Sequence, residues 1–258
     1  MISPVPPIAQ FLDVSAGYRD RNGLLSVLEH INFDVQMGQF VCVLGPSGSG
    51  KTTLLRVLSG LLEPIAGEAG FGGERIDGPV PEIGLVFQAA NLMPWRTVVE
   101  NIHLPLEVGG GMNGSATPRV QEMIELVRLT GFEQSLPGDL SGGMAQRVAI
   151  ARALVQNPEM LLLDEPFGSL DAMTRERMGE ELLRIWRAEK KTVMMVTHDI
   201  GEAVFLADRV LVVSERPAEI VFDMDINLPR PRKVDMRYTP EFGDYAVELR
   251  KILRQQQK

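Results

Sequence analysis

The stretch Gly45-Pro46-Ser47-Gly48-Ser49-Gly50-Lys51-Thr52-Thr53 decides the fold of this chain. It has the pattern of a phosphate-binding loop: a glycine, four residues, then Gly-Lys-Ser/Thr. It follows an apolar run at residues 40–44 and precedes a helix-like run at 53–58, the context in which this pattern has a mechanism. Because glycines let the backbone curl around an anion, successive N–H groups can point at phosphate oxygens at a helix N-terminus. We therefore predict a nucleotide-binding loop in which Lys51 reaches the β- and γ-phosphates and Thr52 holds Mg²⁺.

The composition is that of a globular protein and limits its partners. Of the 258 residues, 45% are hydrophobic and 23% are charged, which is ordinary for one or two domains. The 34 acidic residues outnumber the 26 basic ones, and the formal charge of −8 argues against a nucleic-acid partner held by counterion release. The single cysteine, Cys42, lies in the apolar run before the loop, so we expect a core residue in a reducing compartment.

The sequence also bears on targeting and membranes. Residues 1–10 have no positively charged segment followed by an apolar one, so we expect no secretory signal there. The longest apolar runs, such as 160–163 and 193–196, are far below the roughly 20 residues that a membrane-spanning helix needs. We therefore expect any role at a membrane to come through a partner.

Short strands and turns flank the loop. Residues 11–35 are expected to form short antiparallel strands, broken at Gly17, at Asn22-Gly23 and, just beyond them, at Gly38. Tyr18 lies in this part, and two roles remain open for it: packing in a half-buried strand, or an aromatic face for an adenine ring. After the loop helix, a short apolar run at 83–87 ends at Gln88.

Residues 89–140 have the pattern of an inserted, helical subdomain. A short helix is expected at 97–106, and three glycines at 109–111 predict a flexible break. Thr117-Pro118 then has the pattern of an N-cap followed by proline at the first helical position. Trp95 could be a core residue or part of a contact surface, and spacing alone does not decide between them.

Polar groups follow directly on two further apolar runs. The run 160–163 leads into Asp164-Glu165, and the run 192–197 leads into His198. In an open parallel sheet, ligands bind outside the carboxyl ends of the strands, so these groups and the loop should share one edge. Ser141-Gly142-Gly143, just before a helical run, is a second anion-binding arrangement, although the same residues are also ordinary in turns.

These motifs, taken together and in this order, resemble the ATP-binding subunits of ABC transporters. The resemblance covers nearly the whole chain: residues 45–52 match the first nucleotide motif, Gln88 the Q-loop, 140–147 the signature motif, 160–165 the second nucleotide motif, 170–171 the D-loop, and His198 the switch histidine. Tyr18 is similar in placement to the adenine-stacking aromatic residue.

The resemblance implies an α/β fold of the ABC ATPase type. This fold has a P-loop NTPase core with a mainly parallel sheet, an N-terminal antiparallel β subdomain and an inserted α-helical subdomain. We expect the cassette at 11–215, with the insertion at about 89–140, and a C-terminal extension at 216–258 that adds a strand at 220–226 and a helix at 239–253. The basic cluster Arg230, Arg232 and Lys233 in this extension is expected to be solvated surface.

The resemblance further implies a division of roles at an ATP site shared by two copies of the chain. Lys51 fixes the triphosphate, Glu165 polarises the attacking water, His198 contacts the γ-phosphate, and Gln88 joins the Mg²⁺ site to the helical insertion. Mg²⁺ is held by Thr52, Gln88 and, through water, Asp164. The residues expected to contact the nucleotide are Tyr18, Gly45, Pro46, Ser47, Gly48, Ser49, Gly50, Lys51, Thr52 and Thr53, with Ser141, Gly142, Gly143 and Asp171 of the signature motif and D-loop.

Finer features resemble the importers for nitrate, sulfonates, taurine and related solutes. These features are residues 91–97, Met144 where most cassettes have glutamine, 167–168, and 228–232. Met144 and Gly168-Ser169 depart from the broad family pattern but lie beside the polar groups implicated in nucleotide contact. The resemblance implies a homodimer at the cytoplasmic face of the inner membrane, with separate permease subunits, an indirect solute-binding protein and no nucleic acid. Nitrate, an alkanesulfonate, taurine and a pyrimidine precursor all remain open as the solute.

Two other classes of protein are less consistent with the sequence. One is a soluble ABC ATPase that acts on ribosomes or DNA, but the chain has a single cassette, an acidic balance and no heptad pattern between Lys51 and Asp164. The other is a P-loop kinase, which gives no reason for the signature motif.

Overall fold

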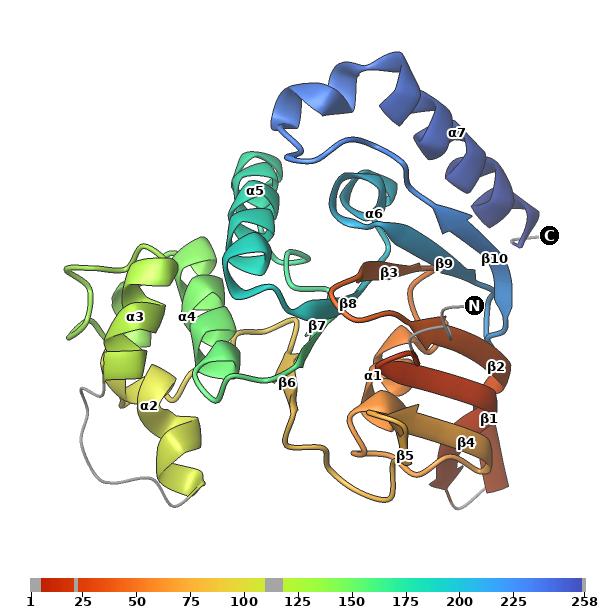
Figure 1. Ribbon diagram of the computed structural model, residues 1–258, viewed down its shortest axis with the longest axis horizontal. Helices are drawn as coiled ribbons and strands as arrows, with labels where there is room; N and C mark the ends of the chain where they lie inside the picture. The colour runs from red at the N-terminus through yellow and green to blue at the C-terminus, as the bar shows by residue number, and fades with distance from the viewer. Residues whose placement is uncertain (1–5, 21–22, 110–117, 257–258) are drawn as a thin grey trace. The chain divides into compact units, whose positions relative to one another are not determined.

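The computed structural model describes residues 6–20, 23–109 and 118–256. By their internal contacts they form two units, one made of the described parts of 1–80 and 192–258 and the other of the described parts of 81–191. Each unit has its own sheet strands and helices (Figure 1). No helix in the described ranges is long and apolar enough to cross a membrane.

The first unit contains an antiparallel sheet in the order β2-β1-β4-β5. Its strands are β1 (Ala9–Asp20), β2 (Gly23–Val35), β4 (Ala66–Phe71) and β5 (Glu74–Arg75). The predicted antiparallel beginning is confirmed, but the predicted break at Gly17 is wrong. β1 runs through Gly17 with a register shift beside it, and a Cβ there would lie 2.2 Å from the carbonyl oxygen of Leu25. The glycine therefore permits a close strand approach at a bulge and does not end the strand.

A second set of strands in the first unit includes β3 (Phe40–Leu44), the strand that leads into the phosphate loop. The order is β10 (Ile220–Asp225), β9 (Arg209–Val213), β3 and β8 (Thr192–Thr197). β3 pairs in parallel with both β8 and β9, whereas β10 is antiparallel to β9. Every residue of β3 and β8 is buried, as expected of strands in the interior of a parallel sheet. Cys42 lies in β3 and is fully buried, so its prediction as a core residue is confirmed.

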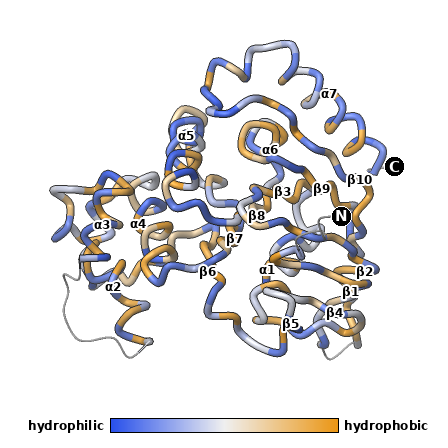
Figure 2. The backbone as a smooth tube through the Cα atoms, in the orientation of Figure 1, coloured by the Kyte–Doolittle hydropathy of each residue, from blue (hydrophilic) through white to orange (hydrophobic). Residues whose placement is uncertain are grey.

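Helices complete the first unit. They are α1 (Lys51–Leu58), α6 (Ile200–Leu206) and α7 (Pro240–Gln255), with a 3₁₀ helix at Val234–Tyr238. β10 and α7 confirm the strand and helix predicted for the C-terminal extension. Figure 2 shows α6 as mainly hydrophobic, and its last five residues are buried.

The basic cluster of the C-terminal extension corrects a prediction. Arg232 is only 6% exposed, and the Arg230 guanidinium bonds the carboxylate of Asp208, so neither belongs to a solvated surface. Lys233 is exposed as predicted. Two of the three basic side chains therefore point into the fold.

The described part of the second unit contains a pair of parallel strands and four α-helices. The strands are β6 (Ile83–Val86) and β7 (Met160–Asp164); the helices are α2 (Val98–Val108), α3 (Pro118–Leu126), α4 (Gly142–Leu154) and α5 (Ala172–Glu189), with a 3₁₀ helix at Pro137–Asp139. Apolar side chains from α2, α3 and α4 fill its interior, among them Ile102, Val120, Met123, Ile124, Val148 and Ile150. With the strands of the first unit, these elements confirm the predicted α/β class.

The helical part of the second unit follows the sequence signals closely. The helix predicted at 97–106 is α2, which starts with a capping box between Thr97 and Glu100. α3 begins at Pro118, whereas Thr117 and the glycines at 110–111 lie outside the described residues. Trp95 is 73% exposed, which decides its open assignment in favour of a surface residue.

Candidate nucleotide site

The phosphate loop joins β3 to α1 inside the first unit. Gly48 and Gly50 have φ values of 78° and 110°, a region that L-residues rarely adopt. At Gly45 an added Cβ would lie 2.5 Å from the side chain of Val213, so the start of the loop has no room for a side chain. The sequence therefore forms a tight loop whose backbone can approach an anion closely.

The N-terminus of α1 lacks the capping found at other helices. The side chains of Thr97, Ser141, Asp171, Asp199 and Thr239 accept a backbone N–H bond at the start of α2, α4, α5, α6 and α7. At α1 the N-cap is Gly50, which has no side-chain bond, and the first turn contains no acidic residue. The first N–H groups of a helix have no partner within it, so α1 is suited to an external anion.

Two side chains of the loop also fit a phosphate ligand. The hydroxyl of Ser49 is buried and finds no hydrogen-bond partner among the described residues. The Nζ atom of Lys51 donates to the carbonyl oxygens of Gly45 (3.0 Å) and Pro46 (2.8 Å), so its charge is held at the loop. A cation, an unsatisfied hydroxyl and uncapped N–H groups together fit the phosphates of a nucleotide.

Tyr18 is tied to the helix that follows the loop. Its hydroxyl lies 3.2 Å from Oγ1 of Thr53 and accepts a bond from Nη1 of Arg56 (3.1 Å). Sequence reasoning did not foresee these bonds, because Thr53 and Arg56 follow Tyr18 by 35 and 38 residues. The aromatic residue is thus held beside the first turns of α1, and adenine stacking remains a prediction.

His198 leaves the sheet at the same edge as the phosphate loop. Leu44 of β3 pairs with Thr197 of β8, and the N–H of Gly45 donates to the carbonyl oxygen of Thr197 (3.4 Å). His198 follows Thr197 directly and precedes α6, whose N-cap is Asp199. The shared edge predicted for the loop and the histidine is therefore confirmed.

The second unit brings three other predicted residues to one edge of its strand pair. Val86 of β6 is in register with Leu163 of β7, so Gln88 lies just beyond the end of β6, beside Asp164 at the end of β7 and Glu165 after it. A Cβ at Gly168 would lie 3.0 Å from Nε2 of Gln88, which places this amide beside the turn after Glu165. Glu165 has φ 42°, a left-handed conformation that is uncommon for a residue other than glycine and is enriched at functional sites.

The signature residues and the D-loop residue begin two neighbouring helices. The Ser141 hydroxyl caps α4 by accepting from the N–H of Met144 (3.3 Å), and Asp171 caps α5 by accepting from that of Thr174 (3.0 Å). Hydrogen bonding to Thr174 lowers the pKa of Asp171. A Cβ at Gly143 would lie 3.1 Å from the Thr174 side chain, so glycine allows α4 and α5 to pack closely here.

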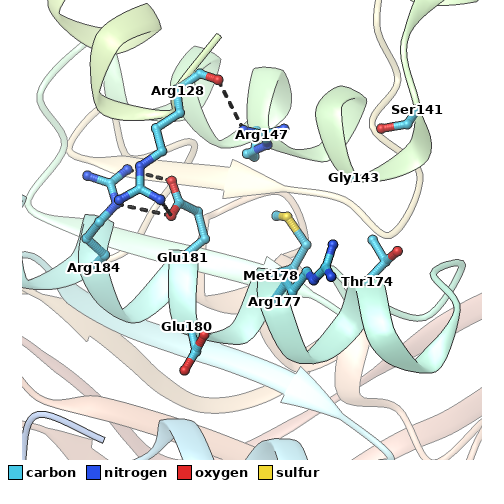
Figure 3. A pocket seen from close by; sticks show the side chains of 10 residues that line it. All are labelled: Arg128, Ser141, Gly143, Arg147, Thr174, Arg177, Met178, Glu180, Glu181 and Arg184. Atoms are coloured by element: carbon cyan, nitrogen blue, oxygen red, sulfur yellow. Dashed lines mark hydrogen bonds and ion pairs between the residues drawn. The ribbon is translucent and has the colours of Figure 1, made fainter. Parts of the chain in front are cut away.

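A cavity of about 570 Å³ adjoins the signature residues within the second unit. Figure 3 shows Ser141 and Gly143 at one end and the Arg128, Arg184 and Glu181 side chains at the other. Arg184 binds the Glu181 carboxylate at 2.5 Å, and Arg128 lies 3.5 Å from it. Sequence reasoning missed this basic lining, because its arginines come from the turn after α3, from α4 and from α5.

The predicted site residues are thus divided between the two units. The loop, Tyr18 and His198 belong to the first, whereas Gln88, Asp164, Glu165, the signature motif and Asp171 belong to the second. Within the described ranges, no three His, Cys, Asp or Glu side chains gather to hold a metal ion. The predicted Mg²⁺ ligands are of another kind, since they comprise one hydroxyl, one amide and one carboxylate.

Comparison with known proteins gives consistent matches along the chain. The family described as "ABC transporter" matches residues 28–168. The aliphatic sulfonates import ATP-binding protein SsuB of Bacillus cereus is 47% identical over 244 residues, which are 95% of this chain and 93% of that protein. The nitrate import ATP-binding protein NrtD of Synechocystis is 41% identical over 251 residues, 95% of this chain and 94% of that protein.

A solved structure supports the same fold. The dimeric post-hydrolysis state of the ATP-binding cassette MJ0796, bound to ADP and Pi, is similar with a TM-score of 0.72 and 31% sequence identity. The match covers 86% of this chain and all of that one.

Proposed function

The chain belongs to the ABC transporter family, and from this premise we propose that it is the ATP-hydrolysing subunit of an importer. The imported solute is a small anion or zwitterion such as nitrate, an alkanesulfonate or taurine, and it passes through a separate membrane permease. Two similar proteins are named as import subunits, for sulfonates and for nitrate, and each covers almost all of this chain. The chain then lies peripherally at the cytoplasmic face of the membrane.

The strongest support for the proposal is the set of phosphate-binding groups at the start of α1. It combines an uncapped helix N-terminus with the unsatisfied hydroxyl of Ser49 and the buried cation of Lys51. An ordinary turn between a strand and a helix would need none of these features. A nucleoside triphosphate supplies acceptor oxygens for the helix N–H groups, the hydroxyl and the cation at once.

The site residues take distinct roles in hydrolysis. The loop amides and Lys51 orient the triphosphate, and the Thr52 hydroxyl, Gln88 and, through water, Asp164 would hold Mg²⁺. When bound, Mg²⁺ neutralises charge on the β- and γ-phosphate oxygens. Glu165 orients a water molecule and accepts its proton at the carboxylate, and His198 contacts the γ-phosphate.

A second copy of the chain completes the site. The sequence supplies a single signature motif, whose Ser141 and Gly143 lie at the N-terminus of α4. The similar cassette MJ0796 is described as dimeric with ADP and Pi. We place the signature of one copy against the nucleotide of the other, so that the N–H groups of α4 meet the γ-phosphate. The cassette in this reading spans 11–215, and the extension spans 216–258.

An apolar groove in the second unit suits the permease. A cavity of about 550 Å³ is bordered by strand β6, the segment after it, and α2, with Phe87, Met93 and Leu104 among the lining side chains. Arg152 donates to the carbonyl oxygens of residues 90 and 91 at its border, which holds that segment in place. Gln88 is next to Phe87 in the chain, so a partner helix in this groove would be coupled to the Mg²⁺ site.

Co-purification from the native membrane tests the proposal. Tagged wild-type protein is extracted in mild detergent beside Met93→Asp in the groove and Val247→Asp on the exposed face of α7. We expect a multi-span permease with the wild type and the α7 variant, but much less with Met93→Asp. Recovery of ribosomal proteins or nucleic acid without a permease would refute the importer, whereas a permease also retained by Met93→Asp would refute the groove.

Once the permease is identified, the solute can be found. Its solute-binding protein would be screened by calorimetry against nitrate, an alkanesulfonate and taurine. Binding of none of the three would refute the proposed solute class.

A further inference from the structure

The end of α6 is held by two arginines from the C-terminal extension. Arg232 donates through Nη1 to three carbonyl oxygens there, and Arg230 donates through Nη2 to a fourth. Because the last carbonyls of a helix have no partner inside it, these side chains supply bonds that α6 itself cannot. The acceptors are Val204 (3.1 Å), Phe205 (3.1 Å) and Ala207 (2.6 Å) for Arg232, and Leu206 (2.8 Å) for Arg230.

Arg232 connects α6 to the segment that follows β10. Its second nitrogen, Nη2, donates to the carbonyl oxygens of Ile226 (3.1 Å) and Leu228 (3.4 Å). Burial lowers its pKa to about 10, so the guanidinium is still charged at neutral pH. A cation at a helix C-terminus also interacts favourably with the helix dipole. The side chain is therefore a buried clamp between two backbone segments.

The other end of α6 is bonded to the residues on both sides of His198. The Oγ1 atom of Thr197 accepts from the N–H of Asp199 (3.0 Å) and donates to the buried carboxylate of Glu202 (2.6 Å). Asp199 in turn accepts from the N–H of Glu202 (2.8 Å). Since α6 has only seven residues, these bonds connect the histidine to the whole helix.

A third arginine of the extension touches α6. The Arg237 guanidinium lies 4.6 Å from the centroid of the Phe205 ring, within the range of a cation–π interaction. A Cβ at Gly201 would lie 3.1 Å from Nη1 of Arg237, so the same side chain also reaches the first turn of the helix. The extension therefore contacts α6 near both of its ends.

We propose that Arg232 is a positioning residue for ATP hydrolysis: by holding the C-terminal carbonyls of α6, it fixes the backbone that carries His198. The inference rests on the proposed role of His198 at the γ-phosphate. It makes the C-terminal extension part of the ATPase machinery, because Arg230 and Arg232, both after residue 225, bond the end of the helix that follows the histidine. Small displacements of a positioned group lower rates steeply.

Nucleotide discrimination provides the test. Arg232→Met, His198→Ala and the double variant of the full-length chain are compared with wild type and with the control Arg209→Met. Arg209 is also a largely buried arginine, but it bonds Asp34 and Asp223 instead of α6. The dissociation constants of ATP and ADP are measured by displacement of a fluorescent nucleotide, and kcat and KM by phosphate release.

We expect Arg232→Met to weaken ATP binding while leaving ADP binding unchanged, because only ATP has the γ-phosphate. Its kcat should fall about ten- to a hundredfold, with a smaller change in KM. The double variant should match His198→Ala alone, since both changes remove the same interaction. Arg209→Met should discriminate the nucleotides as the wild type does.

The opposing outcomes separate the inference from the proposed function. If His198→Ala discriminates ATP from ADP as well as wild type does, the role of the histidine is refuted, and the inference with it. If His198→Ala is impaired but Arg232→Met is not, or if their effects multiply, only the inference is refuted. Equal loss of ATP and ADP affinity in Arg232→Met would indicate a merely structural role and would also refute it.

A conservative variant keeps the test decisive if Arg232→Met does not fold. Arg232→Lys retains the charge but has no planar fork, so it should bond fewer of the carbonyls. We expect a partial loss of ATP over ADP discrimination, together with faster amide exchange at 200–207 in the nucleotide-free protein. Wild-type discrimination and wild-type exchange in Arg232→Lys would overturn the proposal.

Discussion

Replacement of Glu165 by glutamine separates nucleotide binding from hydrolysis. Glutamine keeps the length of the side chain and replaces only the oxygen that accepts a proton. The residue sits in a left-handed turn, in which the N–H of Gly168 donates to the carbonyl oxygen of Glu165 (3.0 Å). The turn is held through the main chain, so Glu165→Gln should leave it and the thermal stability unchanged.

The expected magnitude follows from the role of a general base. Proton transfer by a positioned side chain contributes about 10²–10⁴ in rate, or roughly 2.7–5.4 kcal/mol at 1.36 kcal/mol per decade. ATP affinity depends mainly on the phosphate loop, which is on another element. Glu165→Gln should therefore lower kcat by two to four orders of magnitude and leave the dissociation constant of ATP close to that of the wild type.

The assay combines equilibrium ATP binding with single-turnover phosphate release. Glu159→Gln is the matched control, because this exposed glutamate precedes the opposite end of the same strand, β7. The control should hydrolyse ATP at the wild-type rate. Wild-type hydrolysis by Glu165→Gln would show that this carboxylate is not the base. If the affinity for ATP fell by the same factor as kcat, the carboxylate would be stabilising bound ATP and not only the transition state.

Three further predictions address the loop and the stability of the fold. Lys51→Ala should weaken ATP binding by about 1.5–3 kcal/mol, the value of a charge-assisted hydrogen bond; titration with a fluorescent nucleotide would show this, and unchanged affinity would contradict it. Hydrogen bonds from Thr97 lower the pKa of Glu100 from 4.5, so its contribution to stability is present above that pH and is lost as the pH falls through the lowered value. Melting temperatures from pH 6 to 3 should therefore fall less steeply for Glu100→Gln than for wild type. Burial raises the pKa of the Cys42 thiol, so iodoacetamide should leave it unmodified in the native protein and react after unfolding, as mass spectrometry would show.

The parts of the site that sequence reasoning placed correctly depend on local pattern. The phosphate loop was identifiable because the motif at 45–52 lies directly between an apolar run at 40–44 and a helix-like run at 53–58. His198 could be placed at the same edge because an apolar run ends immediately before it, and the register of Leu44 with Thr197 confirms this. The helix at 97–106 was expected from a short helical pattern in the sequence, and the structure adds the capping box between Thr97 and Glu100 at its start.

The parts that sequence reasoning missed depend on partners far away in the chain. Gly17 suggested a turn, but whether a glycine ends a strand or admits a close neighbour is decided by Leu25 across the sheet. Arg232 lies in a basic segment that looks solvated, and three of its acceptors lie more than 20 residues earlier, at the end of α6. Backbone carbonyl groups at the end of a helix are not marked by any residue type. Composition alone therefore cannot distinguish a buried arginine that caps them from a surface arginine.

Because the start of α1 is uncapped, a bound nucleotide would stabilise the fold in addition to serving as the substrate for hydrolysis. A ligand that binds only the native state adds RT ln(1 + [L]/Kd) to its stability, about 2.7 kcal/mol when its concentration is a hundred times Kd. The free energy of unfolding of the subunit is consequently highest when the nucleotide concentration is high and lowest when it is low. At low nucleotide concentration the nucleotide-free loop would unfold locally more often and become accessible to proteases. A shortage of ATP would then lower the amount of the subunit that hydrolyses it.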